Sequence, residues 1–93
     1  MVIGLLQAKL SLPEAFSLKD KRMILRSLKD RMMNKMNVSV AEVDYQDIWK
    51  SALLAIVTVA AEKSVVEKRL AEVSEHIRSN PRVVLVDIRV EIM

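Results

Sequence analysis

The segment that most constrains the fold is WKSALLAIVTVA, residues 49–60. Read as a β-strand, it has two alternating rows of side chains, and both rows are mostly apolar: Leu53, Ala55, Val57 and Val59 in one, and Ala52, Leu54, Ile56 and Thr58 in the other. Because alternate side chains of a strand face opposite sides of its sheet, such a strand needs cover on both faces. We therefore expect it in the middle of a sheet.

Three other segments also follow the two-residue period of a strand, namely residues 2–10, 38–44 and 83–92. The first has one dry face and one mixed face, the second alternates weakly, and the last has a clean polar row formed by Asp87, Arg89 and Glu91. Charged rows are typical of the strands at the edges of a sheet, where charge blocks further pairing. We expect residues 38–44 and 83–92 at the edges, with residues 45–47 as a turn.

Two segments follow a helical period. The first begins after Ser17, which we expect to be its N-cap, and Asp20 stands at the capping-box position. It runs to about Met36, and Asn37 is expected to be a left-handed C-terminal cap. The second is expected to open with a capping box at Ser64 and to end at Asn80-Pro81. Each carries one apolar stripe: Leu18, Leu25, Leu28, Met32 and Met36 in the first, and Val66, Leu70, Val73 and Ile77 in the second.

The order of these elements is strand, helix, strand, strand, helix, strand. Right-handed crossovers place the first and third strands in the centre. We therefore predict an α+β fold in a single domain, residues 1–93: a ferredoxin-like βαββαβ sandwich with a four-stranded antiparallel sheet of order 4-1-3-2. Both helices are expected on one face.

The other sheet face then lacks cover within the chain. Ile3, Leu5, Leu85 and one row of residues 49–60 are expected on it, and an apolar patch of several hundred Å² is unusual in a monomer. A homodimer or a bound partner would remove it from water. The alternative is that charged neighbours such as Lys9 and Asp87 keep it solvated.

Composition excludes several kinds of site. The 93 residues contain no cysteine, one histidine and one glycine. Thiolate metal sites, disulfides, phosphate-binding glycine loops and GXXG RNA loops are therefore excluded, and nothing in the spacing around His76 suggests a catalytic triad. We expect no enzyme activity, cofactor or metal. Apolar runs end well before 18 residues and the N-terminus lacks a basic leader, so we expect a cytoplasmic protein outside the membrane.

Positive charge is concentrated in residues 17–37, which hold seven Lys or Arg residues against two Asp residues. On a helix, Lys19, Arg22, Arg26 and Lys29 fall within an arc of about 80° and extend over about 15 Å. Phosphates along a nucleic-acid strand recur within a few ångströms, so this ladder predicts contact with RNA. The alternative is an ordinary solvated helix face.

The turn region is acidic and carries the only tryptophan. Glu42, Asp44 and Asp47 are carboxylates that would hold Mg²⁺ or act as an acid and a base if they converged, although edge protection explains them more simply. Asp44, Asp47 and Trp49 are candidate partner- or ligand-binding residues, but we expect Trp49 to cap the core. Stacking of RNA bases on the sheet is not expected, because the aromatic residues lie off the central strands.

Two stretches of the sequence are distinctive: Ser17-Leu18-Lys19-Asp20-Lys21-Arg22, and NVSVAEVD at residues 37–44, which is followed by Gln46-Asp47 and Trp49. In these residues the sequence resembles the YlxP-like family of small bacterial proteins. The resemblance covers essentially the whole chain and implies a ferredoxin-like fold of unknown function, with genes often found among translation and ribosome-maturation genes. Tyr45 departs from the more polar residue that the resemblance leads us to expect at that position. No active residues can be carried over.

Three hypotheses follow from the sequence. The first is a non-enzymatic protein that binds RNA or a ribosomal particle through its first helix. The second is a dimeric structural or small-ligand module that uses the open sheet face or the acidic hairpin. The third, and most remote, is an enzyme built at the acidic turn.

Overall fold

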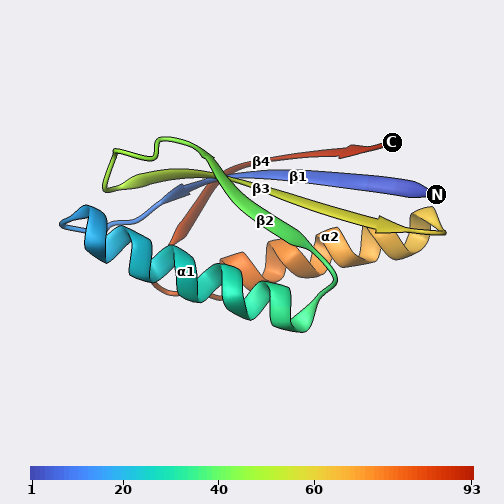
Figure 1. The fold of residues 1–93 in the computed structure, drawn as a ribbon, viewed down its shortest axis with the longest axis horizontal. Helices are drawn as coiled ribbons and strands as arrows, with labels where there is room; N and C mark the ends of the chain where they lie inside the picture. The colour runs from blue at the N-terminus through green and yellow to red at the C-terminus, as the bar shows by residue number, and fades with distance from the viewer.

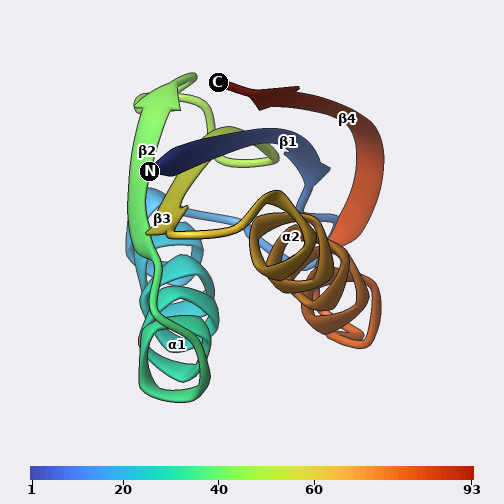
Figure 2. The ribbon, with the colours of Figure 1, turned by 90° about the vertical axis from the view of Figure 1, so that its right-hand side faces the viewer.

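The computed structural model describes residues 1–93 and contains one sheet and two helices. Strand β1 spans Val2–Ser11, α1 Leu18–Lys35, β2 Ser39–Asp44, β3 Ser51–Ala60, α2 Lys63–Arg78 and β4 Val84–Ile92. All three strand pairings are antiparallel, and the strand order is β2-β3-β1-β4. Figures 1 and 2 show both helices on the same side of the sheet. The predicted ferredoxin-like sandwich is confirmed.

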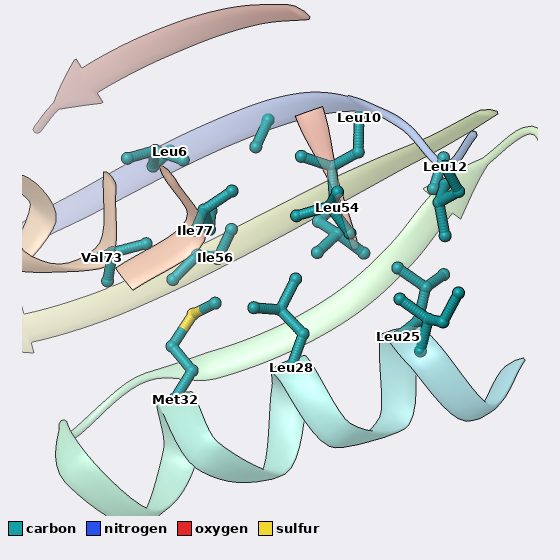
Figure 3. Close-up of a cluster of buried hydrophobic side chains, with 14 of the residues drawn as sticks. Leu6, Leu10, Leu12, Leu25, Leu28, Met32, Leu54, Ile56, Val73 and Ile77 are labelled. Atoms are coloured by element: carbon teal, nitrogen blue, oxygen red, sulfur yellow. The ribbon is translucent and has the colours of Figure 1, made fainter. Parts of the chain in front are cut away.

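The core lies between the sheet and the two helices (Figure 3). The dry row of β1, including Leu6 and Leu10, meets Leu54 and Ile56 of β3, as the two-residue period predicts. From the helix side, the stripes contribute Leu25, Leu28, Met32, Val73 and Ile77. The burial of these apolar side chains supplies the main force that holds helices and sheet together.

Gly4 allows α2 to approach the sheet closely. A Cβ atom at this position would overlap Cγ1 of Val66 and would lie 3.0 Å from Cδ1 of Leu70. The backbone of Gly4 is otherwise ordinary for a strand, without a positive φ angle. The only glycine is therefore needed for packing space and not for a turn.

One of the three predicted helix caps is confirmed. The hydroxyl of Ser17 accepts from the backbone N–H of Asp20 at 3.0 Å, and Asp20 in turn accepts from the N–H of Phe16. The left-handed cap at Asn37 is wrong, because the only non-glycine residue with a positive φ angle is Tyr45, at 64°. The chain instead leaves α1 in an extended conformation at Met36, which lets β2 start after a very short connection.

The capping box at Ser64 is also wrong. Helix α2 begins two residues earlier than a Ser64 cap requires, at Lys63, with Glu62 as its N-cap and without a side-chain hydrogen bond there. The two-residue connection after β3 explains this difference, since it leaves no room for an extended residue at position 64. Ser64 thus lies inside the first turn.

Leu85 lies on the helix side of the sheet and not on the open face, so that expectation is wrong. The pairing of β1 with β4 shifts between Lys9 and Leu10, which pair with Asp87 and Leu85 and leave Val86 as the extra residue. A bulge of this kind reverses the faces of the residues beyond it. Leu85 consequently packs against the core.

Candidate nucleic-acid interface

Lys21 fixes α1 to the hairpin that joins β2 and β3. Its side chain is 1% exposed, and its ammonium donates to the backbone carbonyls of Tyr45 and Ile48 and lies 2.8 Å from Oε2 of Glu42. Two of the ammonium's three protons are donated to these carbonyls, and the carboxylate of Glu42 lies close enough to balance its charge. The first turn of α1 and the hairpin are therefore held in one arrangement.

The four residues of the predicted ladder lie together on the side of α1 that faces β2. Lys19, Arg22, Arg26 and Lys29 line one groove of about 500 Å³. The first three are exposed and Lys29 is half-buried. The groove also contains Met23 and Met33, and only two carboxylates, Asp30 and Glu42. Its lining combines concentrated positive charge with flexible apolar side chains.

None of the four ladder cations is in an ion pair. The only pair of opposite charges within 4.0 Å in the protein is Lys21 with Glu42, so the groove's nearest carboxylate on β2 is already engaged. Asp30 lies on α1 itself and forms no such pair. The charge of the ladder is thus free to act on an anion in solvent.

The carboxylates of the acidic hairpin, Glu42, Asp44 and Asp47, do not converge on one point. Glu42 points toward the helices, where it meets Lys21, whereas Oδ1 of Asp44 accepts from the neighbouring N–H of Tyr45 at 2.7 Å. Asp47 is exposed in the turn. No group of three or more His, Asp or Glu side chains in the protein could hold a metal ion. The bulge after Glu42, which the alternation of β2 did not reveal, separates Glu42 from Asp44.

All three aromatic residues of the chain lie at one end of the molecule. Phe16, just before α1, is 68% exposed, and Trp49, just after the hairpin turn, is 49% exposed. The expectation that Trp49 caps the core is therefore wrong. The ammonium of Lys50 lies 4.0 Å from the centre of the Phe16 ring and donates to the carbonyl of Pro13, which joins the two segments. Figure 1 shows this hairpin above the start of α1, so the aromatic end adjoins the first turn of the ladder.

Sequence reasoning missed the role of Lys21. Its position was visible, because Leu18, Lys21, Leu25, Leu28 and Met32 follow one another at spacings of three and four. A lysine in line with an apolar stripe predicts a buried ammonium that must find acceptors. The carbonyls that it meets are 24 and 27 residues away and were not predictable from spacing.

His76 lies on α2, away from the ladder. Partial burial lowers its pKa from the usual value, the nearby positive charges of Lys35 and Arg31 lower it further, and a backbone hydrogen bond with Leu28 acts in the opposite direction. The side chain is therefore largely neutral at pH 7. Neither helix of the protein is both long enough and apolar enough to span a bilayer.

Comparison with known proteins places this chain in a family. The family described as a protein of unknown function, DUF503, matches residues 3–90. This chain belongs to the DUF503 family. The uncharacterized protein YlxP of Bacillus subtilis is 35% identical over 82 residues, covering 88% of this chain and 89% of that protein. The predicted resemblance to the YlxP-like family is thereby confirmed, although neither description states a function.

Similar solved structures confirm the fold of this DUF503 chain. The designed protein Foldit4 gives a TM-score of 0.56 at 10% identity, covering 100% of this chain and 97% of its own. The designed protein LFR1 1, described as having a ferredoxin fold, gives 0.55 at 13% identity, with 99% and 85% covered. At these identities the likeness concerns the architecture alone.

Proposed function

We propose that this DUF503 protein is a non-enzymatic binding protein that holds single-stranded RNA in the groove beside α1. The observation that carries the proposal is the set of four cations, Lys19, Arg22, Arg26 and Lys29, that line one groove without an ion-pair partner. A cationic ladder that is free of carboxylate partners attracts a polyanion and releases the counterions condensed on it.

The aromatic end favours a single strand over a duplex. Proteins that bind single strands combine a basic track for the backbone with aromatic rings on which unpaired bases stack. Phe16 and Trp49 are both substantially exposed at the end of the ladder. A duplex would offer its phosphates to the ladder but no free base faces to these rings. The RNA of a ribosomal particle offers such single-stranded segments, in line with the gene neighbourhood that the family resemblance implies.

The salt dependence of binding tests the ladder. If four phosphates are neutralised, log K should fall with log salt at a slope of about −3 for a single strand. The charge reversals Arg22→Glu and Arg26→Glu should each weaken the binding of a short RNA and flatten this slope. Arg78→Glu, an equal charge change at the exposed end of α2, is the matched control. A slope near zero, or equal losses in all three variants, would reject the ladder as the contact.

A second candidate function is homodimerisation through the open sheet face. Ile3 and Leu5 are half-buried in the centre of this face, while Val57 and Val59 beside them are 42% and 48% exposed. A second copy would bring the same apolar strip and would remove both from water. Light scattering at tens of micromolar tests this proposal. A monomeric mass would end it, whereas a dimer should dissociate in Val57→Lys and not in Lys63→Ala.

A further inference from the structure

A second basic hollow lies on the opposite side of α1 from the ladder. It has a volume of about 290 Å³ and is bordered by α1, by the last turn of α2 and by the loop that leads to β4. Its polar lining consists of Ser27, Arg31, His76, Ser79, Asn80 and Arg82. No carboxylate side chain lines it. The hollow is therefore a concave site with two guanidinium groups, an imidazole and small hydrogen-bonding groups from three segments.

We propose that this hollow binds a phosphate group, either as inorganic phosphate or as a phosphate monoester. The two guanidinium groups carry the proposal. Neither Arg31 nor Arg82 is within 4.0 Å of a carboxylate oxygen, so neither has an ion-pair partner. The planar fork of a guanidinium matches two phosphate oxygens at once.

The smaller groups complete the donor set. Oδ1 of Asn80 accepts from the backbone N–H of Arg82 at 2.9 Å, which orients the side-chain NH₂ of Asn80 as a remaining donor and holds Arg82 next to the helix end. The hydroxyl of Ser27 on α1 lines the opposite wall. A phosphate has three or four oxygens with several lone pairs, so it can use donors that converge from both walls.

Three carbonyls at the C-terminal end of α2 are already engaged by donors of the chain itself. Free carbonyls at a helix C-terminus carry partial negative charge and repel an anion. Here the carbonyls of Glu75 and Ile77 accept from the backbone N–H groups of Ser79 and Asn80, and the carbonyl of His76 accepts from the Ser79 hydroxyl at 2.8 Å. Each of these three carbonyls already accepts a hydrogen bond, so it carries less unsatisfied negative charge at the end of the helix.

Two positive side chains of α1 act on His76 at the edge of the hollow. Partial burial lowers the pKa of the imidazole, and the charges of Lys35 and Arg31 on α1 lower it further. On its other side, His76 borders a separate hollow shared with Lys35, Lys68, Glu72 and Glu75. Arg82 likewise borders Glu14 and Asp20 outside the proposed site. A bound anion would reduce the repulsion from Arg31, so His76 should take up a proton when the site fills.

The site is independent of the RNA groove. Arg22 and Lys29 line the groove on the β2 side of α1, and no residue of that groove lines this hollow. The phosphate site can therefore fail or succeed without deciding the proposed RNA function.

The experiment is a titration of the ¹⁵N-labelled protein with inorganic phosphate at constant ionic strength, followed by NMR of the backbone amides and of the His76 side chain. Saturable shifts confined to Ser27, Arg31 and residues 76–82 are expected. Arg31→Gln and Arg82→Gln should each weaken binding about tenfold, the effect of losing one charge-assisted hydrogen bond. Arg26→Gln, in the RNA groove, should leave it unchanged. A second titration with adenosine monophosphate shows, by comparing the two affinities, whether the site prefers a phosphate monoester or inorganic phosphate.

Shifts that grow linearly with phosphate, or that chloride reproduces, would overturn the proposal, as would equal losses in Arg31→Gln and Arg26→Gln. The two hollow variants are expected to unfold at the wild-type temperature, because both arginines are exposed. Sulfate keeps the same charge near neutral pH, so a pH dependence of its binding reports on the proton taken up by His76. The affinity for sulfate should rise as pH falls below about 6.5 in the wild type and should stay flat in His76→Gln.

Discussion

The ammonium of Lys21 lies 2.8 Å from the carboxylate of Glu42, beneath α1 and with only 1% of the lysine side chain exposed. The same ammonium holds the carbonyls of Tyr45 and Ile48, on the two sides of the hairpin turn. It thus connects the start of α1 with β2 and with the turn. Through this connection the basic ladder and the aromatic end keep a fixed relation to each other.

Replacing Lys21 should be the most destabilising single change in α1 outside the apolar core. Lys21→Met keeps the length of the side chain but leaves the Glu42 carboxylate without its ion-pair partner and two carbonyls without their donor. We expect a loss of about 3 kcal/mol in the free energy of unfolding, measured by urea denaturation. Lys19→Met, two residues earlier and exposed, is the matched control and should change stability by less than about 0.5 kcal/mol.

The double variant Lys21→Met with Glu42→Gln should recover part of that loss, because it no longer leaves an unpaired carboxylate. Equal unfolding free energies for Lys21→Met and Lys19→Met would contradict the described role of the buried ammonium.

Gly4→Ala should destabilise the packing of α2 on the sheet. The added methyl group would overlap Cγ1 of Val66 and crowd Cδ1 of Leu70, so either these side chains or the helix must move. Overpacking of this kind costs about 1–3 kcal/mol. The measurement is the midpoint of urea unfolding. Gly4→Ala combined with Val66→Ala should restore part of the stability, whereas an unchanged midpoint in Gly4→Ala alone would show that α2 does not need this approach.

The sequence was sufficient for the topology because the periods of five of its six segments are clear, and the weakly alternating residues 38–44 lie between two of them. The doubly apolar β3, the dry row of β1 and the stripes of both helices lead directly to the observed sandwich. Two of the errors concern local irregularities of the backbone. The bulge at Val86 changed the face of Leu85, and the short connection before α2 moved the helix start away from Ser64. Neither feature alters composition or period enough to be recognised beforehand.

The candidate site was only partly predictable. Helical geometry was enough to place Lys19, Arg22, Arg26 and Lys29 on one side of α1. The neighbours of that side depend on tertiary structure, namely the edge strand β2 and the hairpin bound by Lys21. The same applies to the gathering of Phe16 and Trp49 at one end, since they are 33 positions apart in the sequence.

Acidification should destabilise the protein through His76. The pKa of His76 in the folded protein lies below its usual value of 6.5, so between these two pH values the unfolded chain binds more protons than the folded one. Its contribution to stability is therefore complete above about pH 6.5 and is lost as pH falls through the lowered pKa. Urea unfolding at pH 7.5 and 5.5 measures the difference. His76→Gln should reduce this pH dependence, and an identical dependence in both proteins would contradict the assignment.

The exposed aromatic rings should contribute to the binding of RNA but not to the binding of a polyanion that has no bases. Trp49→Ala and Phe16→Ala should weaken the binding of a short single-stranded RNA by about 1–3 kcal/mol per stacked base, because each removes an exposed ring. Polyphosphate, which has no bases, should bind both variants and the wild type equally through the ladder. Quenching of fluorescence from the single tryptophan measures the RNA complex in the wild type and in Phe16→Ala, and fluorescence anisotropy of a labelled RNA serves for Trp49→Ala. Equal losses for RNA and polyphosphate would mean that the substitutions disturb the groove itself, and unchanged RNA binding would remove the aromatic residues from the interface.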